Sequence, residues 1–101
     1  MKPTTEKMIA KISAYFADKP IVRAYLFGSY SRGEERRGSD VDLLVEMEKE
    51  NDIDLFDWAR MIDELGKKIR HKVDLVDDLG LSKYVRPYVE SDKILIYEQK
   101  H

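Results

Sequence analysis

The feature that most constrains the fold of this chain is a pair of short apolar segments, each bounded by a small polar motif. The first segment, Ile21 to Phe27, ends at Gly28-Ser29, and after ten intervening residues Asp40-Val41-Asp42 opens the second, which continues to Val45. Short apolar runs that are bounded by glycine and polar residues are typical of β-strands. We therefore predict two strands carrying the two motifs, and we expect the motifs to converge at one edge of a sheet.

The rest of the chain alternates between predicted helices and strands. We predict helices at residues 4–18, 31–36, 52–69 and 81–90, and strands at 21–27, 40–46, 72–76 and 93–97. Thr4 or Thr5 is the expected cap of the first helix and Asp52 that of the third, while Pro87 should distort the last helix. This order predicts an α+β fold, an α/β sandwich in which helices flank a four-stranded mixed sheet.

Hydrophobic patterning also predicts which side chains are buried. The near-continuous apolar run of the first strand predicts burial on both of its faces. In the third helix one face should be apolar, and aromatic residues late in the chain should belong first to the core. The residues expected on that helix face are Leu55, Trp58, Ala59, Ile62, Leu65 and Ile69, and the late aromatic residues are Tyr84, Tyr88 and Tyr97.

Composition limits the class of protein and its partners. A length of 101 residues predicts one domain, residues 1–101, with a single core. The chain has no cysteine, which excludes disulfides, and no apolar run of membrane-spanning length, so a cytoplasmic location is the default expectation. The 18 basic residues are balanced by 20 acidic ones. A nucleic acid is therefore not expected as the main partner, since such binding usually needs an excess of positive charge.

The first motif has the chemistry of a phosphate-binding turn. Gly28 and Ser29 can present backbone N–H groups and a hydroxyl to phosphate oxygens. Arg32, just beyond the turn, could pair with phosphate oxygens through two parallel hydrogen bonds or remain solvated. Ser39 could contact a phosphate or cap the turn that leads into the second motif. These four residues are the predicted nucleotide-binding residues.

The second motif has the chemistry of a metal site. Asp40 and Asp42 are separated by one residue, so on a strand they point to the same face, where carboxylate oxygens can hold Mg²⁺. Asp74, in the apolar run 73–76, is the predicted third acid, because a carboxylate inside a strand is costly unless it is paired or bound to metal. Asp77 and Asp78 compete for that role. Two metal ions ~3.5–4 Å apart beside a phosphate cradle are suited to nucleotidyl transfer.

These motifs resemble one known family. The stretches 26–33 and 38–45, with the tail at 73–76, 84–90 and 94–98, are similar to the minimal nucleotidyltransferase (MNT) family of the DNA polymerase β-like superfamily. The resemblance covers nearly the whole chain. It implies ATP as substrate and two Mg²⁺ ions, with Gly28 and Ser29 holding the triphosphate and Asp40 and Asp42 holding metal. Asp74 would complete the metal site or activate the acceptor hydroxyl.

The resemblance also implies a partner. Members of this family typically accompany a helical HEPN-family toxin, an RNA-cleaving protein, and neutralise it by transferring AMP to one of its tyrosines. Two other hypotheses remain open. The chain could neutralise its partner by binding alone, or it could modify RNA or a small molecule with a separate acceptor-binding subunit. An exposed edge at the fourth strand would also permit homo-oligomers.

Overall fold

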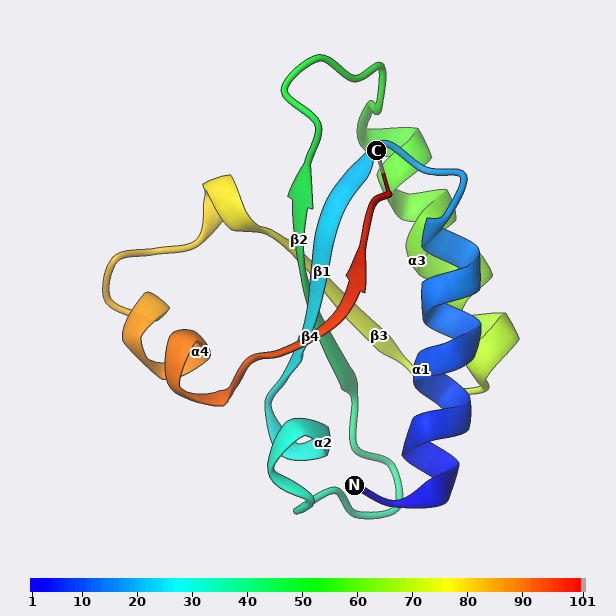
Figure 1. Ribbon diagram of the computed structural model, residues 1–101, viewed down its shortest axis with the longest axis vertical. Coiled ribbons are helices and arrows are strands. Elements are labelled where there is room, and N and C mark those ends of the chain that lie inside the picture. Colours follow the sequence, from blue (N-terminus) through cyan, green and yellow to red (C-terminus); the bar gives the residue numbers. More distant parts are fainter. Residues whose placement is uncertain (101) are drawn as a thin grey trace.

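The structure, a computed structural model, describes residues 1–100; His101, to which the sequence assigns no role, lies outside the described residues. Helices and strands alternate along the chain, as predicted (Figure 1). Their bounds are α1 (Pro3–Phe16), β1 (Ile21–Phe27), α2 (Ser29–Arg32), β2 (Val41–Met47), α3 (Leu55–Ile69), β3 (Val73–Asp77), the 3₁₀ helix η1 (Asp78–Gly80), α4 (Arg86–Asp92) and β4 (Ile94–Glu98).

The four strands form one mixed sheet, which confirms the predicted fold class. Their order is β3-β2-β1-β4, with β1 antiparallel to both β2 and β4, and β2 parallel to β3. Figure 1 shows α1 and α3 side by side against one face of the sheet and α4 on the opposite side. The parallel pair is joined by α3, as a parallel connection requires a crossover element.

The main core lies between the sheet and the helices α1 and α3. Alternate residues of the two central strands point into it, and fully buried side chains from both helices fill the space between them. These side chains are Ile12, Phe16, Ile21, Leu26, Val41, Leu43, Val45 and Leu65. The opposite face is covered only in part. Leu44 and Val89 are buried there, but Tyr25 and Phe27 are half-buried, so β1 is fully buried on one face and not on both.

Helix starts differ from the predicted ones because capping depends on backbone geometry that the sequence does not display. Helix α1 starts at Pro3 after Lys2, with no side-chain cap, since proline is well suited to the first helical turn. The cap of helix α3 lies two residues later than predicted, and the helix begins at Leu55. Its cap is Asp54, not Asp52, and Asp54 and Asp57 form a reciprocal capping box.

The last helix is also shorter than predicted. The chain forms η1 at 78–80 and then α4 at 86–92, so Pro87 lies in the first turn of a helix and distorts nothing. Tyr84 and Tyr88, expected in the core, are 75% and 76% exposed, because this segment lies at the margin of the sheet. Trp58 and Tyr97 do pack against the core.

The buried face of α3 differs from the predicted one at its first turns. Leu55 and Ala59 are exposed, and Met61 is buried with Leu65 and Ile69. Trp58 of the first turn still packs against the core, so Leu55 and Ala59 lie at one side of the buried stripe of this helix. Within residues 1–100, every helix is too short or too polar to cross a membrane.

Candidate functional site

The strand pairing brings the two predicted motifs together. Phe27 at the end of β1 is paired with Asp42 of β2, and Asp42 is paired with Asp74 of the parallel strand β3. Gly28 therefore lies beside Asp42, and Asp40, two residues earlier, lies just before β2 at the same end of the sheet. Three carboxylates and the Gly-Ser turn thus meet at one end of the sheet, although they belong to three different strands or the residues next to them.

Gly28 is fitted to this place by the absence of a side chain. Its φ is 73°, in the left-handed region, and a Cβ atom built on it would lie 2.2 Å from Asp42 Oδ2. The turn is held by Ser31, whose Oγ donates a hydrogen bond to the Gly28 carbonyl oxygen at 2.7 Å. We did not predict this role for Ser31; the signal in the sequence is a serine three residues after the glycine of a turn.

The acids are electrostatically coupled. Burial first, and then the charges of Asp74 and Asp40, together raise the pKa of Asp42 to about 6, while the Arg32 guanidinium acts in the opposite direction. Asp74 itself is exposed, so the cost of burial, on which its selection as the third acid depended, applies instead to Asp42. Repulsion among carboxylates at a sheet edge is what a bound cation relieves.

The donor set fits Mg²⁺ in its chemistry but is not preassembled. Asp40, Asp42 and Asp74 supply hard carboxylate oxygens at neighbouring backbone positions, which is the ligand type that Mg²⁺ prefers. Over residues 1–100, however, no group of three His, Cys, Asp or Glu side chains is arranged so as to hold a metal ion. The side chains would therefore have to turn toward a cation as it binds.

The predicted nucleotide-binding residues have different surroundings. The Ser29 carbonyl oxygen accepts a hydrogen bond from Glu34 N at 2.9 Å, and its hydroxyl has no hydrogen-bond partner among the described residues. Ser39 Oγ accepts from Arg36 N at 2.8 Å, and Ser39 N donates to the Arg36 carbonyl oxygen, so Ser39 closes the turn before Asp40. Among residues 1–100 the Ser29 hydroxyl is thus left free, whereas the Ser39 hydroxyl is used by the loop.

The rival acids Asp77 and Asp78 have structural contacts. Asp77 pairs with Val45, three positions along β3 from Asp74, and its Oδ1 accepts a hydrogen bond from Leu79 N at the start of η1. Asp78 accepts from Arg86 Nη1 at 3.0 Å. Both carboxylates therefore hold η1 and α4 in place, away from Asp42.

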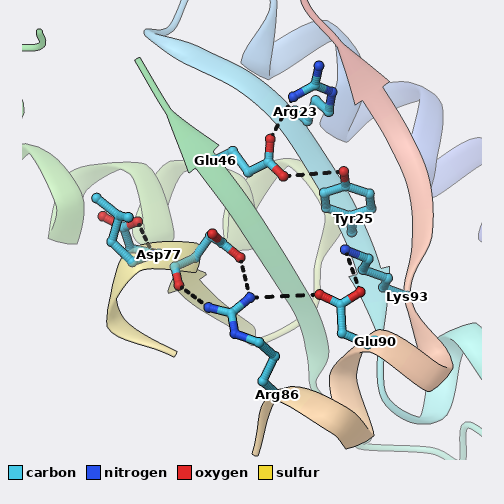
Figure 2. Close-up of polar contacts among 9 residues, drawn as sticks. Arg23, Tyr25, Glu46, Asp77, Arg86, Glu90 and Lys93 are labelled. Atoms are coloured by element: carbon cyan, nitrogen blue, oxygen red, sulfur yellow. Dashed lines mark hydrogen bonds and ion pairs between the residues drawn. The ribbon is translucent and has the colours of Figure 1, made fainter. Parts of the chain in front are cut away.

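Further polar contacts lie on the face of the sheet beside α4. Figure 2 shows two connected groups on this face. In the first, Glu46 of β2 accepts hydrogen bonds from Arg23 and Tyr25 of β1. In the second, Arg86 and Lys93 both pair with Glu90, and Lys93 also lies over the Tyr25 ring, 4.4 Å from its centroid. The contacts of Glu46 and the contact between Lys93 and Tyr25 join residues far apart in sequence, and no sequence motif indicates them.

The fold and the site together define a nucleotidyltransferase. The family model described as "Polymerase beta, Nucleotidyltransferase" matches residues 10–101, and the chain belongs to this family. The predicted resemblance and the predicted enzyme class are confirmed at this level.

The chain is similar to a curated protein and to a solved structure. The chain is 33% identical over 100 residues to the "putative protein adenylyltransferase MJ1379" of Methanocaldococcus jannaschii, covering 95% of this chain and all of that protein. It is also similar to the crystal structure of a toxin-antitoxin pair with AMP-PNP, with 26% identity, a TM-score of 0.76, and coverage of 91% of this chain and 74% of the other.

A third likeness concerns the fold alone. The complex of a tri-AMPylated Shewanella oneidensis HEPN toxin with an MNT antitoxin contains a chain that is 23% identical, with a TM-score of 0.72. The match covers 93% of this chain and 72% of the other. The four-stranded mixed sheet with its helices is therefore a fold that this protein shares with a chain of that complex.

Proposed function

We propose that this protein transfers AMP from ATP to a tyrosine hydroxyl of a HEPN-type partner and thereby acts as its antitoxin. The observation that carries the proposal is the meeting of Asp42, Asp74 and Asp40 with the Gly28-Ser29 turn at one sheet edge. A turn that leaves room only for glycine, set against repelling carboxylates, suits a triphosphate with its metal ions. The relatives named as a protein adenylyltransferase and as toxin-antitoxin pairs support the nucleotide and the type of partner.

In this proposal the residues of the site have separate tasks. Gly28 and Ser29 hold the triphosphate through backbone N–H groups and the free hydroxyl. Asp40 and Asp42 hold Mg²⁺, which when bound supplies positive charge to the phosphoryl oxygens and to the leaving pyrophosphate. Asp74, exposed and directly opposite Asp42, completes the ligand set or accepts the proton of the attacking tyrosine hydroxyl.

The residues around the turn adjust this site. Arg32 lies near enough to Asp42 to favour its charged form, which is the form that binds a cation. Ser39 keeps the loop before Asp40 closed. A cytoplasmic location and residues 1–101 as the acting domain remain predictions that accompany this proposal.

The test is label transfer from ATP labelled at the α-phosphate, with Mg²⁺, to a HEPN-type partner purified in its unmodified form. Wild-type protein should label the partner, and the double variant Asp40→Asn/Asp42→Asn should not. Asp63→Asn is the matched control, because Asp63 is an exposed acid on α3 whose one ion pair among residues 1–100 is with Lys67. Toxin activity on RNA is measured in parallel.

The outcomes distinguish the three hypotheses. Labelling of a partner tyrosine by wild type and by Asp63→Asn, with loss of neutralisation in the double variant, supports the proposal. Neutralisation by the double variant, with an intact complex, would show that binding alone suffices. Label that appears only in RNA or in a small molecule would replace the protein acceptor.

A further inference from the structure

Helix α4 contacts the candidate site through one ion pair that sequence analysis does not reveal. Arg32, the last residue of α2, donates a hydrogen bond from Nη1 to Oδ2 of Asp92, sixty positions further along the chain at the end of α4. A second carboxylate, Glu34 Oε2, accepts from Arg32 Nε at 3.0 Å. The Asp92 side chain is only 19% exposed and that of Arg32 is 44% exposed, so the pair is partly shielded from solvent.

Asp92 is not explained by the stability of its own helix. A carboxylate in the last turn of a helix meets the negative end of the helix dipole, and α4 has no basic residue in its last turn. The neighbouring Lys93 pairs with Glu90 at 2.9 Å. Arg32 is therefore the group that compensates Asp92, and the contact joins α4 to the turn that begins at Gly28.

The geometry of a guanidinium makes this contact directional. The group is planar and rigid, so fixing two of its nitrogen atoms also fixes the third. Glu34 and Asp92 hold Nε and Nη1, and Nη2 has no hydrogen-bond partner among residues 1–100. Arg32 ends the short helix α2, which begins at Ser29 of the Gly28-Ser29 turn, and its charge acts on Asp42, so the guanidinium borders the candidate site.

We propose that Asp92 is a positioning residue: it holds the Arg32 guanidinium so that Nη2 is presented to the phosphate oxygens of a nucleotide bound at Gly28-Ser29. This inference rests on the proposed nucleotidyltransferase site and adds α4 to it. Asp92 touches neither nucleotide nor acceptor, and it acts only through Arg32. Replacing it should therefore weaken nucleotide binding more than it changes the rate of transfer from bound nucleotide.

The experiment measures the Kd for AMP-PNP with Mg²⁺, and the KM for ATP and kcat of adenylylation, in four variants. Removing the partner that orients a metal-ligating side chain typically costs about 10- to 100-fold, and by the same reasoning we expect about tenfold for this partly exposed pair. Asp92→Asn should raise Kd and KM by that factor with little change in kcat. Asp92→Glu should recover part of the loss. In the Arg32→Ala background, Asp92→Asn should have no further effect.

Glu90→Gln is the matched control, because Glu90 lies on the same helix but pairs with Lys93 and Arg86. It should leave Kd unchanged, and thermal unfolding of each variant shows whether α4 is retained. An unchanged Kd in Asp92→Asn, or an equal loss with and without Arg32, would overturn the inference. The binding measurement also separates the two proposals: wild type that binds AMP-PNP but modifies no protein refutes the proposed acceptor, while the role of Asp92 is still decided by Kd.

Discussion

Replacing Asp42 with asparagine should make the metal-free protein more stable while abolishing its activity. Asp42 is held between Asp74, Asp40 and the Gly28 backbone, and this environment raises its pKa from 3.8 to about 6. A raised pKa means that the folded state disfavours the carboxylate relative to the unfolded state. At neutral pH the native protein therefore retains a charge that the fold opposes, and asparagine keeps the shape without that charge.

The size of the stability gain follows from the rise in the pKa of Asp42. A rise in this pKa from 3.8 to about 6 corresponds to at most about 3 kcal/mol. Since Asp42 is only partly buried, solvent screening reduces this substantially, and we expect about 1 kcal/mol. For a chain of this size that gain would raise Tm by about 4–8 °C.

The stability difference between wild type and Asp42→Asn should depend on pH. Well below pH 3.8 Asp42 is protonated in both the folded and the unfolded state, so wild type and Asp42→Asn should be equally stable. Between pH 4 and about 6 the unfolded state loses its proton first, so wild-type stability falls relative to the variant. Above pH 6 the difference should be constant.

The assay is urea unfolding in the presence of a chelator at about pH 3, below the unfolded-state pKa, and at about pH 7.5, with Asp63→Asn as the control for removal of an exposed charge. A variant that is less stable than wild type at pH 7.5, or equally more stable at both pH values, would refute the reasoning. Addition of Mg²⁺ and AMP-PNP should then stabilise wild type by mass action and Asp42→Asn far less, which removes the difference between them.

Three other substitutions test separate parts of the structure. Gly28→Ala should abolish AMP-PNP binding and lower stability, because a Cβ atom would meet Asp42 Oδ2 at 2.2 Å; unaltered binding by calorimetry would contradict the close approach. Asp54→Ala should cost about 1 kcal/mol in urea unfolding by removing the capping box of α3, with unchanged adenylylation. Phe16→Ala should cost about 3–5 kcal/mol, since Phe16 is fully buried in the core; a loss below about 1 kcal/mol would mean that this core readily rearranges.

The sequence was sufficient for the order of elements and for the chemistry of the motifs. Strand positions at 21–27, 40–46, 72–76 and 93–97 agree with the structure to within one residue, because short apolar runs bounded by polar residues allow few alternatives. Helix starts were less well predicted. The cap at Asp54 and the start at Pro3 depend on backbone angles. Residue type alone does not show which of two neighbouring candidates has the backbone angles of a cap.

The prediction of buried residues failed where the position of a residue in the tertiary structure outweighs the type of its side chain. Tyr84 and Tyr88 have the composition of core residues, yet the segment that bears them lies at the margin of the sheet and leaves them exposed. Leu55 is exposed because it lies at one side of the stripe of α3 that faces the core, although Trp58 in the same turn packs against that core. Local patterns report what a residue prefers, whereas exposure depends on which neighbours arrive from elsewhere in the chain.

The sequence by itself therefore determined the elements, the Gly28-Ser29 turn, the paired acids and the family. Tertiary structure alone decided that Asp74, rather than Asp77 or Asp78, stands opposite Asp42, and that Asp92 reaches Arg32. The physical reason is that spacing along the chain places residues on one strand or helix, but the register between strands and the docking of α4 set distances across elements. The charge coupling that raises the pKa of Asp42 depends on those distances.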